Sequence, residues 1–389
     1  MKLFHCSGCR QRVFFENLQC EACGARLGYV PLEFEMVAFA AAAGGADDAV
    51  GNVPGWQRLG PTGSAQRPCS NYSHEGVCNW MVAADDPQGL CVSCRTTHVI
   101  PALGKPENRT YWNTLEQAKQ RVFYTLLTLK LPVPSLQADP ANGMSFHFLE
   151  DTSPQQRVLT GHDNGVITLN IAEADDAARE TMRAAMREPY RTLVGHFRHE
   201  LGHYYWDRLI ADSPWLDEYR QRFGDERADY ATALQQHYAH PMPDWRLSFV
   251  SAYASSHPWE DWAECWAHYL HMIDGLETAA AWGLRLDCPT PGGEPLQAVA
   301  LNLSAPSFEA TLIQQWLPIS QFSNAMNRSL GLHDSYPFVV PPPVVAKLDF
   351  IHRVVAAATR GEAPMKFLPA LVPAPAQPSG QSAPESVTR

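Results

Sequence analysis

The chain of 389 residues has little positive charge and no long apolar run, and both shortages exclude classes of protein. Lys and Arg number 30 against 41 Asp and Glu, so the formal net charge is -11. Broad nucleic-acid binding depends on Lys and Arg that neutralise phosphates, so we expect no nucleic-acid partner. No run of about 20 apolar residues is present, so we expect no membrane-spanning helix. The first residues, MKLFHCSGCR, also lack the apolar stretch of a signal peptide, and we expect a cytoplasmic protein.

A reducing cytoplasm means that the ten cysteines need an explanation other than disulfides. The first group consists of two CxxC pairs separated by ten residues, which are Cys6, Cys9, Cys20 and Cys23. Each pair places two thiolates on one tight turn, and two such turns close a tetrahedral structural zinc site. A redox-active dithiol is the alternative, which the pairing of two turns disfavours.

A second, looser group consists of Cys69, Cys78, Cys91 and Cys94. Only its last two members share a CxxC turn, so His74 or His98 could replace a thiolate in a second structural zinc site. Positive and negative side chains around the first Cys group are nearly equal in number, so the sequence predicts no basic patch that could bind nucleic acid. We therefore expect the zinc-binding units to dock a protein partner or to be purely structural.

Composition and periodicity divide the chain into parts. We expect a zinc ribbon over residues 1–35, a linker over 36–64, a second Cys-rich unit over 65–105, a large domain over 106–365 and a disordered tail over 366–389. In the large domain, strand-like alternation over 144–149 and 166–171 precedes helical periods. This order predicts an α+β fold, mainly helical with a small sheet. The prolines at 341–343 predict extended backbone.

The segment 199–203, HELGH, is an HExxH motif on a helix predicted from Pro189 to about residue 210. Residues four apart share one helix face, so His199 and His203 can bind one metal ion. Glu200 lies one position round, where it can take a proton from water that zinc activates. A surface helix with two solvated histidines is the alternative. We expect His196 to pack or hydrogen-bond rather than bind metal, because HxxH lacks a Glu in the base position.

Two histidines leave a tetrahedral zinc ion one protein ligand and one water short. The segment 258–268, PWEDWAECWAH, offers Glu260 and Glu264 four residues apart on a predicted helix. One of them can bind the metal, while the other accepts the free N–H of a ligand histidine. Three tryptophans indicate a buried helix, whereas a solvated acidic face is the alternative. The spacing alone leaves open which glutamate is the ligand.

The pair of motifs HExxH and ExxxE resembles the gluzincin metallopeptidases, and EDWAECWAHYLH is similar to the matching helix of the anthrax lethal factor group. This resemblance implies Glu260 as the third zinc ligand and Glu264 as the partner of a ligand histidine. It also implies that Tyr253, seven residues before Glu260, stabilises the oxyanion. Taken alone, a tyrosine at that position is more often a packing residue.

A closer resemblance covers most of the chain and points to a bacterial family of zinc-binding metallopeptidases with a zinc-ribbon domain. It rests on the two Cys groups and on FRHELGHYYWDRLI, FGDE, HPWEDWAECWAHYLH and YPFVVPPPVVAKLDFIH. The resemblance implies a zincin-like domain with one catalytic zinc ion, one or two structural ones, and hydrolysis of a peptide or protein substrate with Glu200 as general base. A non-catalytic, zinc-stabilised scaffold that binds a protein partner remains the alternative.

Two further segments bear on the expected cleft. Fifty-six residues separate His203 from Glu260, and the insertion over 212–257, rich in Trp, Tyr and Arg, can wall one side of the cleft. The strand GVITLNIAE can lie along the cleft as an edge strand that pairs with an extended substrate. An ordinary core strand is the equal alternative for that segment.

Overall fold

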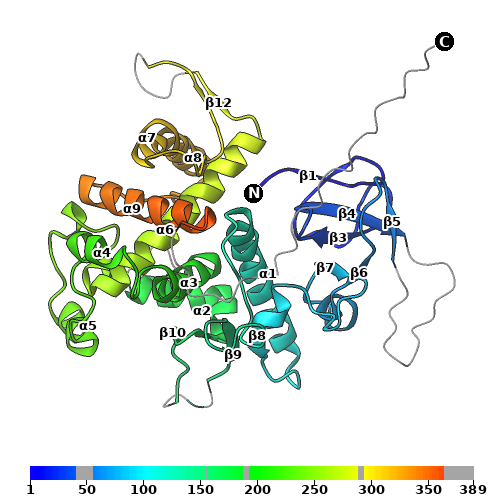
Figure 1. Ribbon diagram of the computed structural model, residues 1–389, viewed down its shortest axis with the longest axis horizontal. Coiled ribbons are helices and arrows are strands. Elements are labelled where there is room, and N and C mark those ends of the chain that lie inside the picture. Colours follow the sequence, from blue (N-terminus) through cyan, green and yellow to red (C-terminus); the bar gives the residue numbers. More distant parts are fainter. Residues whose placement is uncertain (41–55, 152, 154–155, 187–191, 288–292, 363–389) are drawn as a thin grey trace, which may run out of the picture.

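The computed structural model describes residues 1–40, 56–151, 153, 156–186, 192–287 and 293–362. Figure 1 shows a small β-rich part, built from the start of the chain, beside a larger and mainly helical part. Small sheets and long helices coexist as expected, which confirms the α+β class. Within these ranges, no helix combines the length and the apolar character that crossing a bilayer requires. The tail expected over 366–389 lies outside the described residues.

The β-rich part contains a two-stranded hairpin, a three-stranded antiparallel sheet and a second two-stranded sheet. Its strands are β1 (Phe4–His5), β2 (Arg12–Val13), β3 (Arg26–Val30), β4 (Glu35–Ala40), β5 (Gln57–Leu59), β6 (Gln66–Pro68) and β7 (Met81–Ala83). The linker expected over 36–64 is wrong at both ends, because β4 and β5 pair with each other there. The apolar run at 36–39 is buried in this sheet, so it forms core rather than a connection. Residues 41–55 lie outside the described residues.

The helical part holds a four-stranded sheet with the order β10-β11-β9-β8. Its strands are β8 (Thr97–Val99), β9 (Ser145–Leu149), β10 (Gly161–Asp163) and β11 (Val166–Asn170). β8, β9 and β11 run parallel, and β10 runs antiparallel to β11 at the edge. The segment GVITLNIAE is therefore not the edge strand that the sequence allowed, because β10 pairs with its outer side.

The rest of the helical part consists mainly of helices. In chain order they are α1 (Pro106–Thr128), α2 (Asp176–Met186), α3 (Leu193–Leu209), α4 (Leu216–Phe223), α5 (Tyr230–Ala239), α6 (Pro258–Ala281), α7 (Glu309–Thr311), α8 (Leu317–Ser329) and α9 (Pro342–Thr359). A two-stranded ribbon, β12 (Arg285–Leu286) with β13 (Leu296–Gln297), follows α6. α6 is central: α3 and α9 pack against it (Figure 1), and Trp262, Trp266 and Tyr269 along it are fully buried.

The two Cys-rich units share one aromatic core, which includes a residue of the helical part. The ring centroid of Tyr29 lies 4.8 Å from those of Phe15 and Trp80. Tyr124 of α1 joins them, with its ring 5.7 Å from that of Phe15. Residues from both Cys units and from α1 are therefore buried together, so the β-rich part packs as one body against α1.

Two helix starts differ from the sequence-based prediction. α9 begins at Pro342, and within the triplet at 341–343 only Pro341 has extended backbone. Proline is accepted in a first helical turn because the N–H groups there have no partner inside the helix. α3 begins at Leu193, where the hydroxyl of Thr192 accepts a hydrogen bond from the backbone N–H of Gly195. Pro189, the expected start, lies outside the described residues.

Candidate metal centre

α3 and α6 cross where one residue has no side chain. Gly202 of α3 lies so close to α6 that a Cβ built on it would be 2.9 Å from the Cα of Ala263. At the same crossing, the indole N–H of Trp262 donates a 2.8 Å hydrogen bond to the backbone carbonyl of Gly202. This close approach brings the HExxH side chains of α3 against side chains of the first turns of α6.

His199 and His203 of α3 meet Glu260 of α6. Oε2 of Glu260 lies 3.0 Å from Nε2 of His199 and 3.4 Å from Nε2 of His203, and the two nitrogens are 3.2 Å apart. Ligand distances of about 2.0–2.2 Å around a tetrahedral ion place the donors about 3.3–3.6 Å apart. The donor triangle, with sides of 3.0 to 3.4 Å, is therefore close to the size that a zinc ion requires, and small shifts of the side chains would complete the fit. Within the described residues, these three side chains make up the whole group.

Glu264, one turn further along α6, binds the other nitrogen of His199. Its Oε1 lies 2.8 Å from Nδ1 of His199, and its Oε2 accepts a 2.6 Å hydrogen bond from the hydroxyl of Ser251. Burial raises the pKa of Glu264, but the hydrogen bond with His199 and the charge of that ring outweigh burial, so the net pKa is lowered. An ionised Glu264 keeps the proton of His199 on Nδ1, which leaves Nε2 with a lone pair for a metal.

Glu200 is buried next to the ligand triangle. Glu200 is 6% exposed, and this burial raises the pKa of its carboxyl group. The charges of His199 and His203 lower the pKa, but burial has the larger effect. Its Oε2 has no hydrogen-bond partner in the described part of the chain. A buried carboxylate with a raised pKa and an available oxygen is suited to accept a proton.

Two tyrosines from the insertion between α3 and α6 reach the ligand group. Tyr253, in the 3-10 turn Tyr253–Ser255, has its ring centroid 5.9 Å from that of His199. Burial raises the pKa of Tyr253, so its hydroxyl remains a hydrogen-bond donor at neutral pH. The hydroxyl of Tyr230, at the start of α5, donates a 2.7 Å hydrogen bond to Oε1 of Glu260. The sequence placed this insertion beside the cleft but did not single out Tyr230, because no spacing rule links it to Glu260.

Aromatic rings also surround His203. The ring centroid of Trp259 lies 3.9 Å from that of His203. The ring centroid of His162, on β10, lies 6.4 Å from that of His203. Burial lowers the pKa of His162 to about 3, so this imidazole is neutral at physiological pH. Among the residues that the structure describes, no strand pairs with the outer side of β10, and this edge strand carries His162 beside His203.

His196, one turn before His199, has a different partner. Its Nδ1 contacts Oε2 of Glu173, whose other oxygen accepts a 2.5 Å hydrogen bond from the hydroxyl of Thr160. His196 is therefore a hydrogen-bonding residue, as expected from the absence of a Glu after it.

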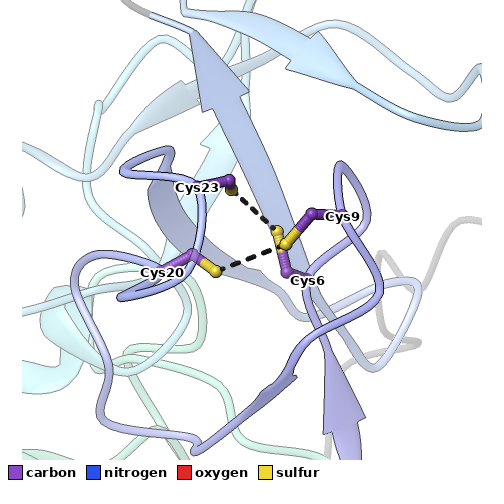
Figure 2. A group of neighbouring side chains, drawn as sticks. All are labelled: Cys6, Cys9, Cys20 and Cys23. Carbon is purple, nitrogen blue, oxygen red and sulfur yellow. Dashed lines mark hydrogen bonds between the residues drawn. The ribbon is translucent and has the colours of Figure 1, made fainter.

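Figure 2 shows the first Cys group, in which Cys6, Cys9, Cys20 and Cys23 point toward one another. The sulfurs of Cys6 and Cys23 are 3.7 Å apart, and those of Cys9 and Cys20 are 3.6 Å apart. A tetrahedral ion with zinc–sulfur distances of about 2.3 Å separates its sulfurs by about 3.8 Å, so the group fits a structural zinc ion. Cys9 and Cys23 are exposed, whereas Cys6 and Cys20 are buried.

The second Cys group is entirely buried and consists of Cys69, Cys78, Cys91 and Cys94. The sulfurs of Cys78 and Cys91 are 3.8 Å apart. The side-chain amide of Gln120 on α1 donates a 3.2 Å hydrogen bond to the sulfur of Cys78, which connects this group to the helical part. Neither His74 nor His98 belongs to the group; His98 stacks on another imidazole instead. Four thiols can therefore form this site without a histidine.

Comparison with known proteins agrees with this architecture. Residues 108–354 match the family described as "Putative zinc-binding metallo-peptidase", and residues 3–105 match a zinc-ribbon domain family. The chain belongs to this metallopeptidase family, which confirms the resemblance noted from the motifs.

Relatives that match most of the chain include mycobacterial proteins. Uncharacterized proteins from Mycobacterium tuberculosis (strain ATCC 25618 / H37Rv) and Mycobacterium bovis are each 43% identical to this chain over 357 residues. The match covers 91% of this chain and 95% of each relative. No solved structure matches the chain.

Proposed function

We propose that this protein hydrolyses peptide bonds, using a zinc ion held by His199, His203 and Glu260. The observation that supports this most is the number of donors: the group has three members within the described residues. A structural zinc site is closed by four protein ligands, whereas a catalytic site keeps one position open. The scaffold alternative requires a fourth ligand, so the three-membered group favours the enzyme.

The surrounding residues have roles that follow from their contacts. When bound, zinc supplies a Lewis acid that activates water and polarises the scissile carbonyl. Glu200 takes the proton from the attacking water and passes it to the leaving amine, and its raised pKa suits both transfers. Tyr253 donates a hydrogen bond to the carbonyl oxygen as it gains charge. Glu264 keeps His199 in its ligating orientation.

The substrate class we propose is a peptide or a protein. In the described part of the chain, β10 is an edge strand beside His203, and an extended peptide can add to the edge of a sheet through backbone hydrogen bonds. This proposal replaces the interior strand β11 with β10 as the substrate-binding strand.

We further propose three zinc ions per chain, one in the His/His/Glu site and one in each Cys group. Eight thiols held as metal ligands are compatible with a reducing cytoplasm, where disulfides are rare. The β-rich part, which packs against α1, is proposed to serve stability or to dock a protein partner, and its balanced charge gives no support for nucleic acid.

The decisive experiment is Glu200→Gln, which keeps the shape of the side chain and removes its capacity to accept a proton. Zinc content measured by mass spectrometry should stay equal to that of the wild type, while cleavage products in a proteome-wide profile disappear. Glu107→Gln, at an exposed position of α1, is the matched control and should cleave like the wild type. Unchanged cleavage in Glu200→Gln would refute the general base, and a fully zinc-loaded wild type that cleaves nothing would favour the scaffold.

A further inference from the structure

The two oxygens of Glu260 have different partners. Oε2 faces His199 and His203, at 3.0 and 3.4 Å from their Nε2 atoms. Oε1 instead accepts the hydroxyl hydrogen of Tyr230 over 2.7 Å. Glu260 is only 2% exposed, so water does not compete freely with this phenol. One oxygen is thus directed at the ligand triangle, and the other is engaged by a tyrosine from a distant segment.

Tyr230 is held in place by contacts around its own ring. The ring packs edge-on against His257, with centroids 5.3 Å apart, and lies 6.2 Å from the ring of Trp259. His257 also donates a 3.0 Å hydrogen bond from Nε2 to the backbone carbonyl of Ala228, just before α5. No residue of α5 is buried. The contacts of this aromatic residue, rather than a hydrophobic core, therefore place the start of α5 against Glu260.

We propose that Tyr230 is a positioning residue that keeps Glu260 a one-oxygen metal ligand, an inference that rests on the proposed function. A carboxylate that binds through both oxygens fills two positions around the ion. With three protein donors, the second oxygen would occupy the position that hydrolysis needs open. The phenol prevents this because its hydrogen bond to an ionised carboxylate is about twice as strong as a neutral one.

The test is Tyr230→Phe, which keeps the ring and removes only the hydroxyl. A chelator first removes the labile zinc from the full-length protein, and cobalt(II) then replaces it. The visible spectrum of His203→Ala, treated in the same way, is subtracted, so that the difference reports the cobalt in the His/His/Glu site. Four-coordinate cobalt absorbs several-fold more strongly than five-coordinate cobalt. We expect the absorption of Tyr230→Phe to fall several-fold below that of the wild type, as Oε1 of Glu260 becomes a further ligand. Turnover of a cleaved substrate should fall about 10–100-fold.

Tyr238→Phe is the matched control, because it removes a hydroxyl from the same helix at a residue that is 62% exposed. Its spectrum should equal that of the wild type. An unchanged spectrum in Tyr230→Phe would overturn the proposal, and so would loss of cobalt binding, since the proposal keeps Glu260 as a ligand. The readout needs no substrate, so an altered spectrum in a protein that cleaves nothing would uphold the role of Tyr230 while the peptidase proposal fails.

Discussion

Nδ1 of His199 and Oε1 of Glu264 lie 2.8 Å apart, although the two residues are 65 positions apart in the chain. Nε2 of the same ring faces Oε2 of Glu260 at 3.0 Å. One histidine thus contacts both carboxylates of the ExxxE segment, one through each nitrogen. This arrangement gives the two glutamates different tasks, which spacing had left open, and the ligand order it supports remains a prediction to be tested.

Replacing each glutamate by alanine should separate these tasks. Glu260→Ala removes a ligand, so we expect this variant to lose one zinc ion per chain. Glu264→Ala leaves the three ligands in place but frees the ring of His199, so we expect zinc to bind about 10–100-fold more weakly. Zinc stoichiometry and competition with a chromophoric chelator measure both effects. Loss of the ion in Glu264→Ala alone would reverse the ligand order.

Gly202→Ala should destabilise the protein at the crossing of α3 and α6. The added Cβ would meet the backbone of Ala263 at 2.9 Å, and forcing such an overlap costs about 1–3 kcal/mol. Alanine otherwise stabilises a helix relative to glycine by about 1 kcal/mol, so a net loss isolates the contact. Urea unfolding provides the measurement. Gly104→Ala is the control, since a Cβ there meets nothing within 4 Å, and equal stabilities of the two variants would contradict the close approach.

Lys347→Met should make stability more sensitive to pH. Nζ of Lys347 lies 2.6 Å from Oδ2 of the buried Asp261. Burial raises the pKa of Asp261 from 3.8 to about 7 even though Lys347 lowers it, so the pKa should rise further without the lysine. A folded-state pKa above the unfolded value means that stability is lost as pH rises between the two, by up to about 1.4 kcal/mol per pH unit.

As pH rises, the decrease in the free energy of unfolding should therefore level off near pH 7 in the wild type and continue above pH 7 in Lys347→Met. Urea unfolding at several pH values between 6 and 9, with zinc in excess, gives the two profiles. Lys130→Met, at an exposed position after α1, should follow the wild-type profile. Parallel profiles for Lys347→Met and the wild type would show that the ion pair does not control the protonation of Asp261.

The two Cys groups should release zinc at different rates. Cys9 and Cys23 are exposed, whereas every sulfur of the second group belongs to a buried residue. A thiol-modifying reagent should therefore attack the first group in the folded protein and the second only after unfolding. A zinc-sensitive dye should report release in two phases, and mass spectrometry of modified peptides should assign the faster one to Cys9 and Cys23. Modification of both groups at one rate would contradict the difference in burial.

The amino-acid sequence by itself determined the features that depend on short-range geometry. His199 and His203 share a face because residues four apart on a helix always do, and a CxxC pair forms one tight turn whatever surrounds it. The same holds for the helix that carries Glu260 and Glu264. These patterns were enough to predict the zinc ribbon, the α+β class and the side chains that gather in the candidate metal groups.

Only the tertiary structure decided which segments meet. The hydrogen bond of Tyr230 with Glu260, the hydroxyl of Ser251 on Glu264 and the position of β10 beside His203 join segments separated by many residues. The chain between 36 and 64 looked like a linker because its Gly and Pro dominate locally, yet its ends pair as strands. Such contacts depend on how helices and strands pack against one another, and no spacing rule within one segment encodes that packing.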